Sequence, residues 1–175
     1  MKRIGSILFL GCLLFMQASA QDQKMTAFIN ELMGKMTVDE KIGQLNLTTS
    51  GDFVTGAAEN ANVLQKVRNG EIGGMFNSFS IASMRAAQDI AVKESRNHIP
   101  LLFGMDVIHG YRTIFPIPLA LSCVWDMDLI EKSARIAAQE ATANGVAWTF
   151  SPMVDIARDP RWGRIAEGGG EDPWL

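Results

Sequence analysis

The sequence has little cysteine and no strong excess of charge of either sign. Its 175 residues include two cysteines, Cys12 and Cys123, and the formal net charge is -3. Such a balance provides no basic stripe, which argues against a nucleic-acid partner and leaves a neutral ligand open. Because Cys12 falls in a predicted leader, Cys123 remains alone and has no internal disulfide partner. We therefore expect Cys123 to be a small buried hydrophobic residue.

Several catalytic signatures are absent as well. The sequence has no Walker-type loop, no G-x-G-x-x-G segment, no serine nucleophile elbow and no clustered Cys/His pattern. We therefore predict no cofactor and no metal. With 47% apolar and 20% charged residues, the composition is that of an ordinary soluble globular domain. The length is sufficient for one domain with a real core.

The N-terminal apolar run, residues 4–16, is too short to span a bilayer comfortably. Lys2 and Arg3 precede it, and Ala18-Ser-Ala20 follows as a small-residue cleavage site. We interpret residues 1–20 as a cleaved signal peptide that directs secretion across the inner membrane to the periplasm. A lipoprotein site at Cys12 is the weaker alternative, because the residues after it remain hydrophobic.

The remaining chain alternates helix-like and strand-like segments. Ser80 and Asp126 are predicted helix caps, and Thr37 and Glu40 form a predicted capping box. The expected helices cover residues 25–33, 37–42, 59–69, 80–97 and 126–144, and the expected strands cover residues 43–47, 72–76, 101–105 and 146–150. This alternation predicts an α/β fold with a parallel sheet. A closed (β/α)₈ TIM-like barrel needs eight strands, so we expect residues 21–175 to hold about half a barrel, as the N-terminal fragment of a longer protein.

Two of the predicted strands run directly into charged and glycine-rich sequence. The strand at 101–105 is followed by Asp106 and His109, and the strand at 146–150 leads to the segment 158–164. In a parallel barrel, such residues lie at the C-terminal mouth, where ligands bind. For Asp106 we favour a ligand-binding carboxylate over a helix cap or a structural ion pair. For His109 a structural role is the more common one.

The second cluster is Arg158-Asp159-Pro-Arg161-Trp162-Gly-Arg164. The planar fork of arginine suits hydrogen bonds to hydroxyls or carboxylates, and tryptophan offers an apolar face to a sugar ring. The alternative is that Arg158, Asp159 and Arg161 form a salt-bridge cluster that shapes the loop. We expect some of these residues to be structural and Arg164 to be the one that reaches ligand.

Three further carboxylates follow, at Glu167, Glu171 and Asp172. Glycoside hydrolysis normally needs two carboxyl groups, about 5 to 5.5 Å apart in retaining enzymes. The glycines at 168–170 make the placement of these side chains unpredictable. Spacing alone therefore identifies no catalytic pair.

The segments 102–110, 113–120 and 150–164 closely resemble glycoside hydrolase family 3, in particular its periplasmic β-glucosidases, and residues 41–45 fit the start of the same domain. The resemblance implies a (β/α)₈-like barrel and retaining cleavage of terminal β-linked glucose from β-glucosides or oligosaccharides. It also implies that Asp106 and Arg164 bind hydroxyls of the non-reducing glucose.

By the same resemblance, the family's Lys-His sugar-binding pair, its aspartate nucleophile and its general-acid glutamate lie downstream of residue 175. No catalytic residue is therefore expected in this fragment, which alone should be inactive. His109, Arg158, Asp159 and Trp162 are expected to support the site. Two alternatives remain open: a non-catalytic sugar-binding or scaffold module, and a β-xylosidase of the same family.

Overall fold

The computed structural model describes residues 22–49 and 62–174. The predicted signal peptide, residues 1–20, lies outside the described residues. The described residues fall into two compact units, which divide between Lys41 and Ile42. Over the described ranges, no helix combines the length and the apolar character needed to cross a membrane.

The first unit is helical. Residues 22–35 form one helix, which confirms the helix predicted at 25–33. Helix α2 (Val38–Gln44) begins with a capping box. The amide of Thr37 donates to Glu40 Oε2 at 2.8 Å, and the amide of Glu40 donates to Thr37 Oγ1 at 3.2 Å. The two side chains thus satisfy two amides at the helix start, as the sequence predicted.

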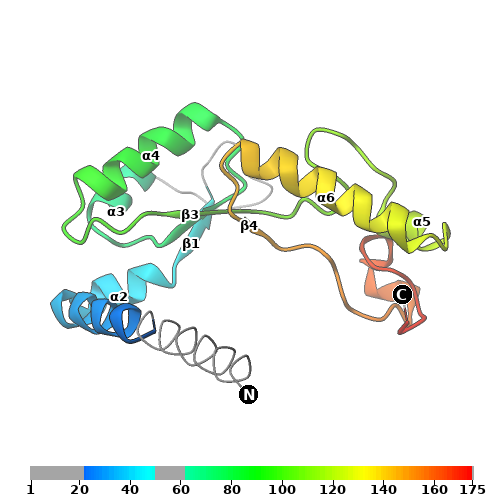
Figure 1. Ribbon diagram of the computed structural model, residues 1–175, viewed down its shortest axis with the longest axis horizontal. Helices are drawn as coiled ribbons and strands as arrows, with labels where there is room; N and C mark the ends of the chain where they lie inside the picture. Colours follow the sequence, from blue (N-terminus) through cyan, green and yellow to red (C-terminus); the bar gives the residue numbers. More distant parts are fainter. Residues whose placement is uncertain (1–21, 50–61, 175) are drawn as a thin grey trace, which may run out of the picture. The chain divides into compact units, whose positions relative to one another are not determined.

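The second unit contains a parallel four-stranded sheet in the order β1-β2-β3-β4 (Figure 1). The strands are Leu47–Thr49, Gly74–Phe76, Leu102–Met105 and Trp148–Thr149. Leu47 pairs with Gly74, Gly74 with Leu102, and Gly104 with Trp148. The predicted parallel α/β arrangement is therefore confirmed.

The position predicted for the first strand is wrong, because residues 43–44 end α2 and the strand begins at Leu47. Gly43 lies in the last turn of α2, at a close backbone contact. A Cβ at this position would lie 2.1 Å from the carbonyl oxygen of Gly70. The glycine thus permits a close backbone approach at the end of α2, which an apolar pattern alone does not reveal.

Among residues 62–174, four α-helices and two 3₁₀ helices accompany the sheet. They are α3 (Val63–Arg68), α4 (Ile81–Lys93), α5 (Pro118–Ser122), α6 (Met127–Ala143), η1 (Pro160–Trp162) and η2 (Ile165–Glu167). Both predicted caps are present: the Ser80 hydroxyl accepts from the Ser83 amide at 3.3 Å, and Asp126 Oδ1 accepts from the Leu129 amide at 3.0 Å. Helix α5 was not predicted, and it begins with proline in its first turn, where a missing amide costs nothing.

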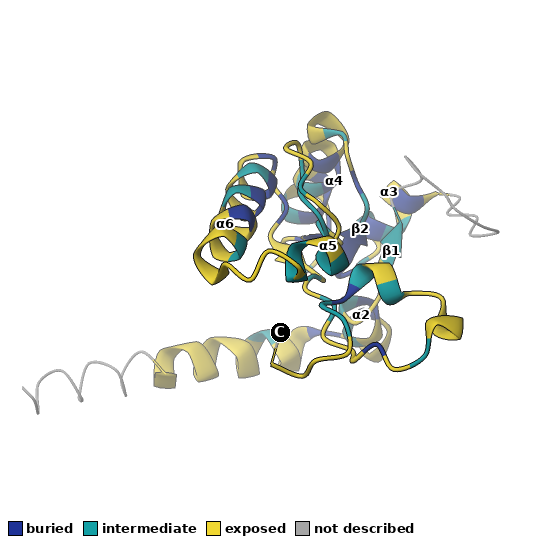
Figure 2. Ribbon diagram, turned by 90° about the vertical axis from the view of Figure 1, so that its right-hand side faces the viewer, coloured by how far each residue is buried: buried dark blue, intermediate teal, exposed yellow. Residues whose placement is uncertain are grey.

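The hydrophobic core lies between one face of the sheet and helices α3 and α4 (Figures 1 and 2). Alternation along the strands directs Met75, Phe103 and Met105 to this face. They belong to one buried cluster with Val67 of α3 and Met84 of α4. Burial of large apolar side chains, at about 1.5 to 3 kcal/mol each, is the main force that holds this layer together.

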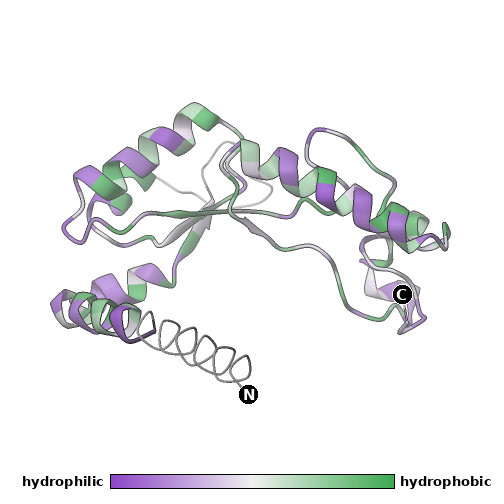
Figure 3. Cartoon of the chain, viewed as in Figure 1, coloured by the Kyte–Doolittle hydropathy of each residue, from purple (hydrophilic) through white to green (hydrophobic). Residues whose placement is uncertain are grey.

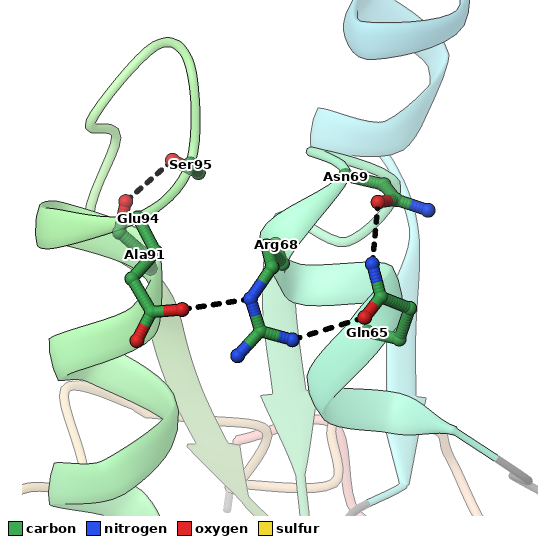
Figure 4. Close-up of polar contacts among 6 residues, drawn as sticks. All are labelled: Gln65, Arg68, Asn69, Ala91, Glu94 and Ser95. Carbon is green, nitrogen blue, oxygen red and sulfur yellow. Dashed lines mark hydrogen bonds and ion pairs between the residues drawn. The ribbon is translucent and has the colours of Figure 1, made fainter.

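Polar contacts fasten α3 to α4 at the surface (Figure 4). Arg68 Nε donates to Glu94 Oε2 at 2.7 Å, and Arg68 Nη1 donates to Gln65 Oε1 at 3.0 Å. Gln65 in turn donates to Asn69 Oδ1 at 2.9 Å. These groups are exposed, so such pairs contribute little to stability compared with the apolar cluster beneath them.

The opposite face of the sheet is more exposed and carries aromatic rings. Leu102 is 52% exposed and Trp148 is 45% exposed. The Phe150 ring lies 5.3 Å from that of Phe76 and 4.7 Å from that of Trp148, measured between centroids. A Cβ on Gly104 would lie 2.9 Å from the Phe150 ring, so this glycine leaves space for the cluster.

Hydrophobic and hydrophilic residues alternate along α6 (Figure 3), and Ala137 and Ala141 are buried whereas Leu129 is 48% exposed. The residue that follows α5 corrects one prediction. Cys123, predicted to be buried, is exposed. It follows α5, a five-residue helix that buries none of its side chains, so the apolar neighbours of Cys123 do not bring it into the core.

Candidate functional site

Asp106 directly follows β3, and its side chain is exposed. Two hydroxyls from the end of β4 hold the backbone at this point. Thr149 Oγ1 donates to the carbonyl of Asp106 at 3.2 Å, and Ser151 Oγ donates to the carbonyl of Val107 at 3.3 Å. Val107 has a φ of 47°, which turns the chain sharply after the strand. The position of Asp106 is thus tied to the neighbouring strand.

The loop after Asp106 contains His109, which is half-buried and borders a mostly apolar cavity of about 510 Å³ beside α6. The Phe115 amide donates to the carbonyl of His109 at 2.8 Å. The ring atom Nδ1 of His109 is buried and has no hydrogen-bond partner within residues 22–49 and 62–174. His109 therefore stays a candidate supporting residue rather than a satisfied structural histidine.

Arg164 follows η1, and its guanidinium is held by Glu167 in a bidentate pair. Nε donates to Glu167 Oε1 at 2.9 Å, and Nη2 donates to Oε2 at 2.5 Å. This hydrogen bonding raises the pKa of Arg164, and the negative charges of Asp155 and Asp106 raise it further. The same pair lowers the pKa of Glu167. The guanidinium of Arg164 is thus fixed chiefly by Glu167.

Glu167 is a residue to which the sequence pattern assigned no role. The available signal was its spacing of three residues from Arg164, which suits ion pairs on a helical turn. A bidentate carboxylate fixes the plane of a guanidinium as well as its position. Glu167 thus orients the side chain that we predicted would reach ligand.

The alternative prediction of a salt-bridge cluster is correct in part. Asp159 accepts hydrogen bonds from the amide of Arg161 at 2.9 Å and from its Nε at 3.0 Å, and these bonds lower the pKa of Asp159. In the part of the chain that the structure describes, Arg158 takes no part in this pair. Trp162 lies in η1 between the two arginine pairs and is 41% exposed. The loop is thus shaped by Asp159 and Arg161.

The two remaining carboxylates, Glu171 and Asp172, follow the segment of the loop that returns beside Ala157. The amide of Ala157 donates to the carbonyl of Gly170 at 2.9 Å, which brings the two arms of the loop together. Glu171 and Asp172 lie just beyond and are exposed. No group of three or more His, Cys, Asp or Glu residues suited to a metal ion occurs among the residues described. The available chemistry is hydrogen bonding to a polar ligand, from an exposed carboxylate and an exposed guanidinium.

Comparison with known proteins gives the family. The sequence profile described as "Glycosyl hydrolase family 3 N terminal domain" matches residues 37–175. The chain belongs to glycosyl hydrolase family 3. Its parallel sheet and helices form part of the TIM-barrel-like α/β domain, with four strands described against the eight of a closed barrel. The predicted fold class is thereby confirmed.

The chain is similar in sequence to proteins named as beta-glucosidases and as beta-xylosidases. The chain is 44% identical to a periplasmic beta-glucosidase of Salmonella typhimurium over 149 residues, which are 85% of this chain and 19% of that protein. It is 28% identical to a lysosomal beta glucosidase of Dictyostelium discoideum, over 85% of this chain and 21% of the relative. A beta-xylosidase of Formosa agariphila is 43% identical over 68 residues, 38% of this chain and 9% of the relative. The chain thus spans about a fifth of the length of the first two.

Solved structures agree with this assignment. A beta-glucosidase from Listeria innocua in complex with isofagomine has a TM-score of 0.75 and 42% identity, covering 85% of this chain and 21% of that one. A mutant of the Listeria enzyme in complex with laminaribiose has a TM-score of 0.71 and 43% identity, covering 85% and 22%. The likeness at this identity extends to sequence as well as fold.

Proposed function

We propose that the full-length protein is an exported, retaining family 3 glycoside hydrolase that removes terminal non-reducing β-D-glucose from β-glucosides or oligosaccharides. The observation that carries this proposal is the match of residues 37–175 to the family 3 N-terminal domain, with Asp106 at the end of β3 and Arg164 in the loop after β4. The 44% identity to a periplasmic beta-glucosidase supports the activity and the location. The neighbours solved with isofagomine and laminaribiose support the ligand class.

In this proposal Asp106 and Arg164 bind different hydroxyls of the same pyranose ring. The carboxylate of Asp106 accepts hydrogen bonds from sugar hydroxyls, and the guanidinium of Arg164 donates to them. Charge-assisted hydrogen bonds are about twice as strong as neutral ones, so two such groups select a hydroxyl-rich ring efficiently. Trp162 offers its exposed ring to the same ligand. His109, Arg158 and Asp159 support the site around them.

The same proposal assigns residues 1–20 to a signal peptide and residues 21–175 to an incomplete barrel domain. The nucleophile and the general acid then belong to sequence downstream of residue 175. This chain by itself is expected to bind weakly and to hydrolyse nothing. Its partners are β-linked glucosides or oligosaccharides, with neither nucleic acid nor a membrane involved.

The test is the substitution Asp106→Ala in the full-length protein, assayed with an aryl β-glucoside. We expect kcat/KM to fall by about 10- to 100-fold, because a hydrogen bond to a charged group is lost in the transition state. Asp128→Ala, in the exposed first turn of α6, serves as the matched control and should leave kcat/KM unchanged. Unchanged kinetics in the Asp106 variant would refute its role in sugar binding.

A second candidate function is β-xylosidase activity. The observation that favours it is the similarity to proteins named beta-xylosidase and to one named periplasmic beta-glucosidase/beta-xylosidase from Dickeya chrysanthemi, 30% identical over 140 residues. The ratio of kcat/KM for aryl β-glucoside and aryl β-xyloside decides between the two. A protein that binds glucose and cleaves neither substrate would instead be a sugar-binding module.

A further inference from the structure

We propose that Glu140 of α6 is a positioning residue for sugar binding, which holds the loop that carries Asp106 in its binding-competent conformation. This inference rests on the proposed function, because it assigns Glu140 a part in the same site. Glu140 itself does not reach the ligand. It acts through the backbone of residues 112 and 113, at the far end of the loop from Asp106.

The carboxylate of Glu140 contacts the loop through both of its oxygens. Oε2 accepts the backbone amides of Arg112 and Thr113, each at 2.8 Å. Oε1 accepts the hydroxyl of Thr113 at 2.6 Å. Two consecutive amides directed at one oxygen form a small anion-binding turn, which an ionised carboxylate satisfies better than a neutral group. The resulting lowered pKa of Glu140 is consistent with an ionised clamp.

The residue that caps the C-terminus of α6, Asn144, reinforces the contact. Asn144 Oδ1 accepts from Nη2 of Arg112 at 3.0 Å, and its Nδ2 donates to the carbonyl of Glu140 at 2.9 Å. Asn144 is buried, with 9% of its surface exposed. Arg112 is therefore held through its backbone and its side chain at once, which gives this end of the loop a defined position relative to α6.

The segment between this clamp and Asp106 has little freedom to absorb a displacement. Gly110 adopts a φ of 113°, and a Cβ there would lie 1.9 Å from the carbonyl oxygen of Thr113. The amide of Phe115 binds the carbonyl of His109 within the same turn. At the strand end, Thr149 holds the carbonyl of Asp106. Because the turn between Gly110 and Thr113 is tight, a displacement of the backbone at Arg112 should also displace the residues next to Asp106.

The decisive experiment is Glu140→Gln in the full-length protein, alone and combined with Asp106→Ala. Glutamine keeps the size of the side chain and removes the charge that the two amides face. For an aryl β-glucoside we expect KM to rise by about 3- to 10-fold in the single variant, with a smaller change in kcat. In the Asp106→Ala background the same change should alter KM less than twofold, because the group being positioned is already absent.

Glu131→Gln is the matched control on the same helix. Glu131 pairs with Arg135 one turn along the exposed surface of α6, at 2.7 Å, so its loss should leave KM unchanged. An equal rise of KM in both backgrounds would overturn the inference, since Glu140 would then act independently of Asp106. An unchanged KM in the single variant would overturn it as well.

Amide hydrogen exchange gives a readout that does not depend on activity. In Glu140→Gln we expect faster exchange over residues 106–115 and unchanged exchange in α3 and α4. If the wild-type protein cleaves no glycoside, the proposed function fails, and unchanged exchange in the loop would separately refute the clamp. Thr113→Val, which removes one of the three bonds, provides the same readout if the glutamine variant does not fold; it should speed exchange over the same residues, and no change there would refute the clamp.

Discussion

The layer formed by α3, α4 and the strand face beneath them differs in its chemistry from the site loops, residues 106–117 and 150–170. Met75, Phe103 and Met84 are buried in one apolar cluster in the first region. In the second, the contacts are hydroxyls, carboxylates and guanidinium groups at 2.5 to 3.3 Å, mostly at the surface. Apolar burial is non-directional, whereas hydrogen bonds specify orientation. The stabilising core and the candidate site residues therefore lie in different parts of the molecule.

This separation makes substitutions in the two regions distinguishable. A change in the apolar layer should alter the free energy of unfolding and leave the kinetic constants of the folded molecules intact. A change in the site loops should alter KM and leave stability almost unchanged, because exposed polar contacts add little to it. The variants that follow test this difference, each in the full-length protein.

The largest effect is expected for Phe103→Ala. Removing a buried phenylalanine side chain should lower the free energy of unfolding by about 3 to 5 kcal/mol, through lost burial and the cavity left behind. Urea denaturation followed by fluorescence measures it. Leu64→Ala on α3 is the control, since that side chain is 46% exposed, and it should cost less than about 1 kcal/mol. Equal costs at the two positions would mean that the apolar layer is not the stabilising core.

A smaller effect, on ligand binding, is expected for Thr149→Val. Valine keeps the branched shape and removes the hydroxyl that donates to the carbonyl of Asp106. We expect KM for an aryl β-glucoside to rise by about 2- to 10-fold, in line with the loss of one hydrogen bond. Thr142→Val, on the exposed surface near the end of α6, should leave KM as it is. A fall in stability without a change in KM would place Thr149 with the apolar layer instead.

The clamp at Glu140 should also depend on pH in a defined direction. Its hydrogen bonds with Thr113, and then with the Arg112 amide, lower the pKa of Glu140. Because the folded pKa lies below the unfolded one, the stabilisation is complete above the ordinary glutamate value of about 4.3 and is lost as the pH falls through the folded pKa. Amide exchange of residues 112 and 113, corrected for intrinsic rates, should show protection that declines below that range. Protection in Glu140→Gln that declined identically would contradict this assignment.

The smallest effect is expected at the Asp159–Arg161 pair. Both side chains are well exposed, and such pairs are strongly screened by water and salt. Asp159→Asn should therefore leave the thermal midpoint unchanged and raise KM by only about twofold, because an exposed pair shapes the loop weakly and does not contact the sugar itself. Differential scanning calorimetry with the same kinetic assay checks both. A large loss of stability would show that the arginine loop belongs to the core rather than to the site.

Features with local physical causes were predictable from the sequence. The caps at Ser80 and Asp126 depend on residues within one helical turn, and the strand before Asp106 depends on a short apolar run. The start of the first strand was predicted wrongly, because the apolar run at 43–47 does not reveal that its first residues end α2 or that Gly43 meets the backbone of Gly70, which is distant in sequence. The exposure of Cys123 depends on how α5 packs, which its apolar neighbours do not determine.

The residues of the candidate site likewise include some that the sequence predicts and some that it does not. The pattern at the strand ends predicted Asp106 and Arg164 as candidates, since it reflects a general property of parallel barrels. The residues that hold these two were not recognised. Glu140 contacts Thr113 across 27 positions of sequence and Thr149 contacts Asp106 across 43, so only the folded chain brings them together. Supporting residues of this kind leave no spacing signal.

The most direct test is a crystal structure of the full-length protein with glucose bound. We predict that an oxygen of Asp106 and a nitrogen of Arg164 both lie within hydrogen-bond distance of hydroxyls on one pyranose ring, with Glu167 still paired to the guanidinium. A glucose molecule bound elsewhere, with both side chains turned to solvent, would contradict the proposed binding role of the two residues.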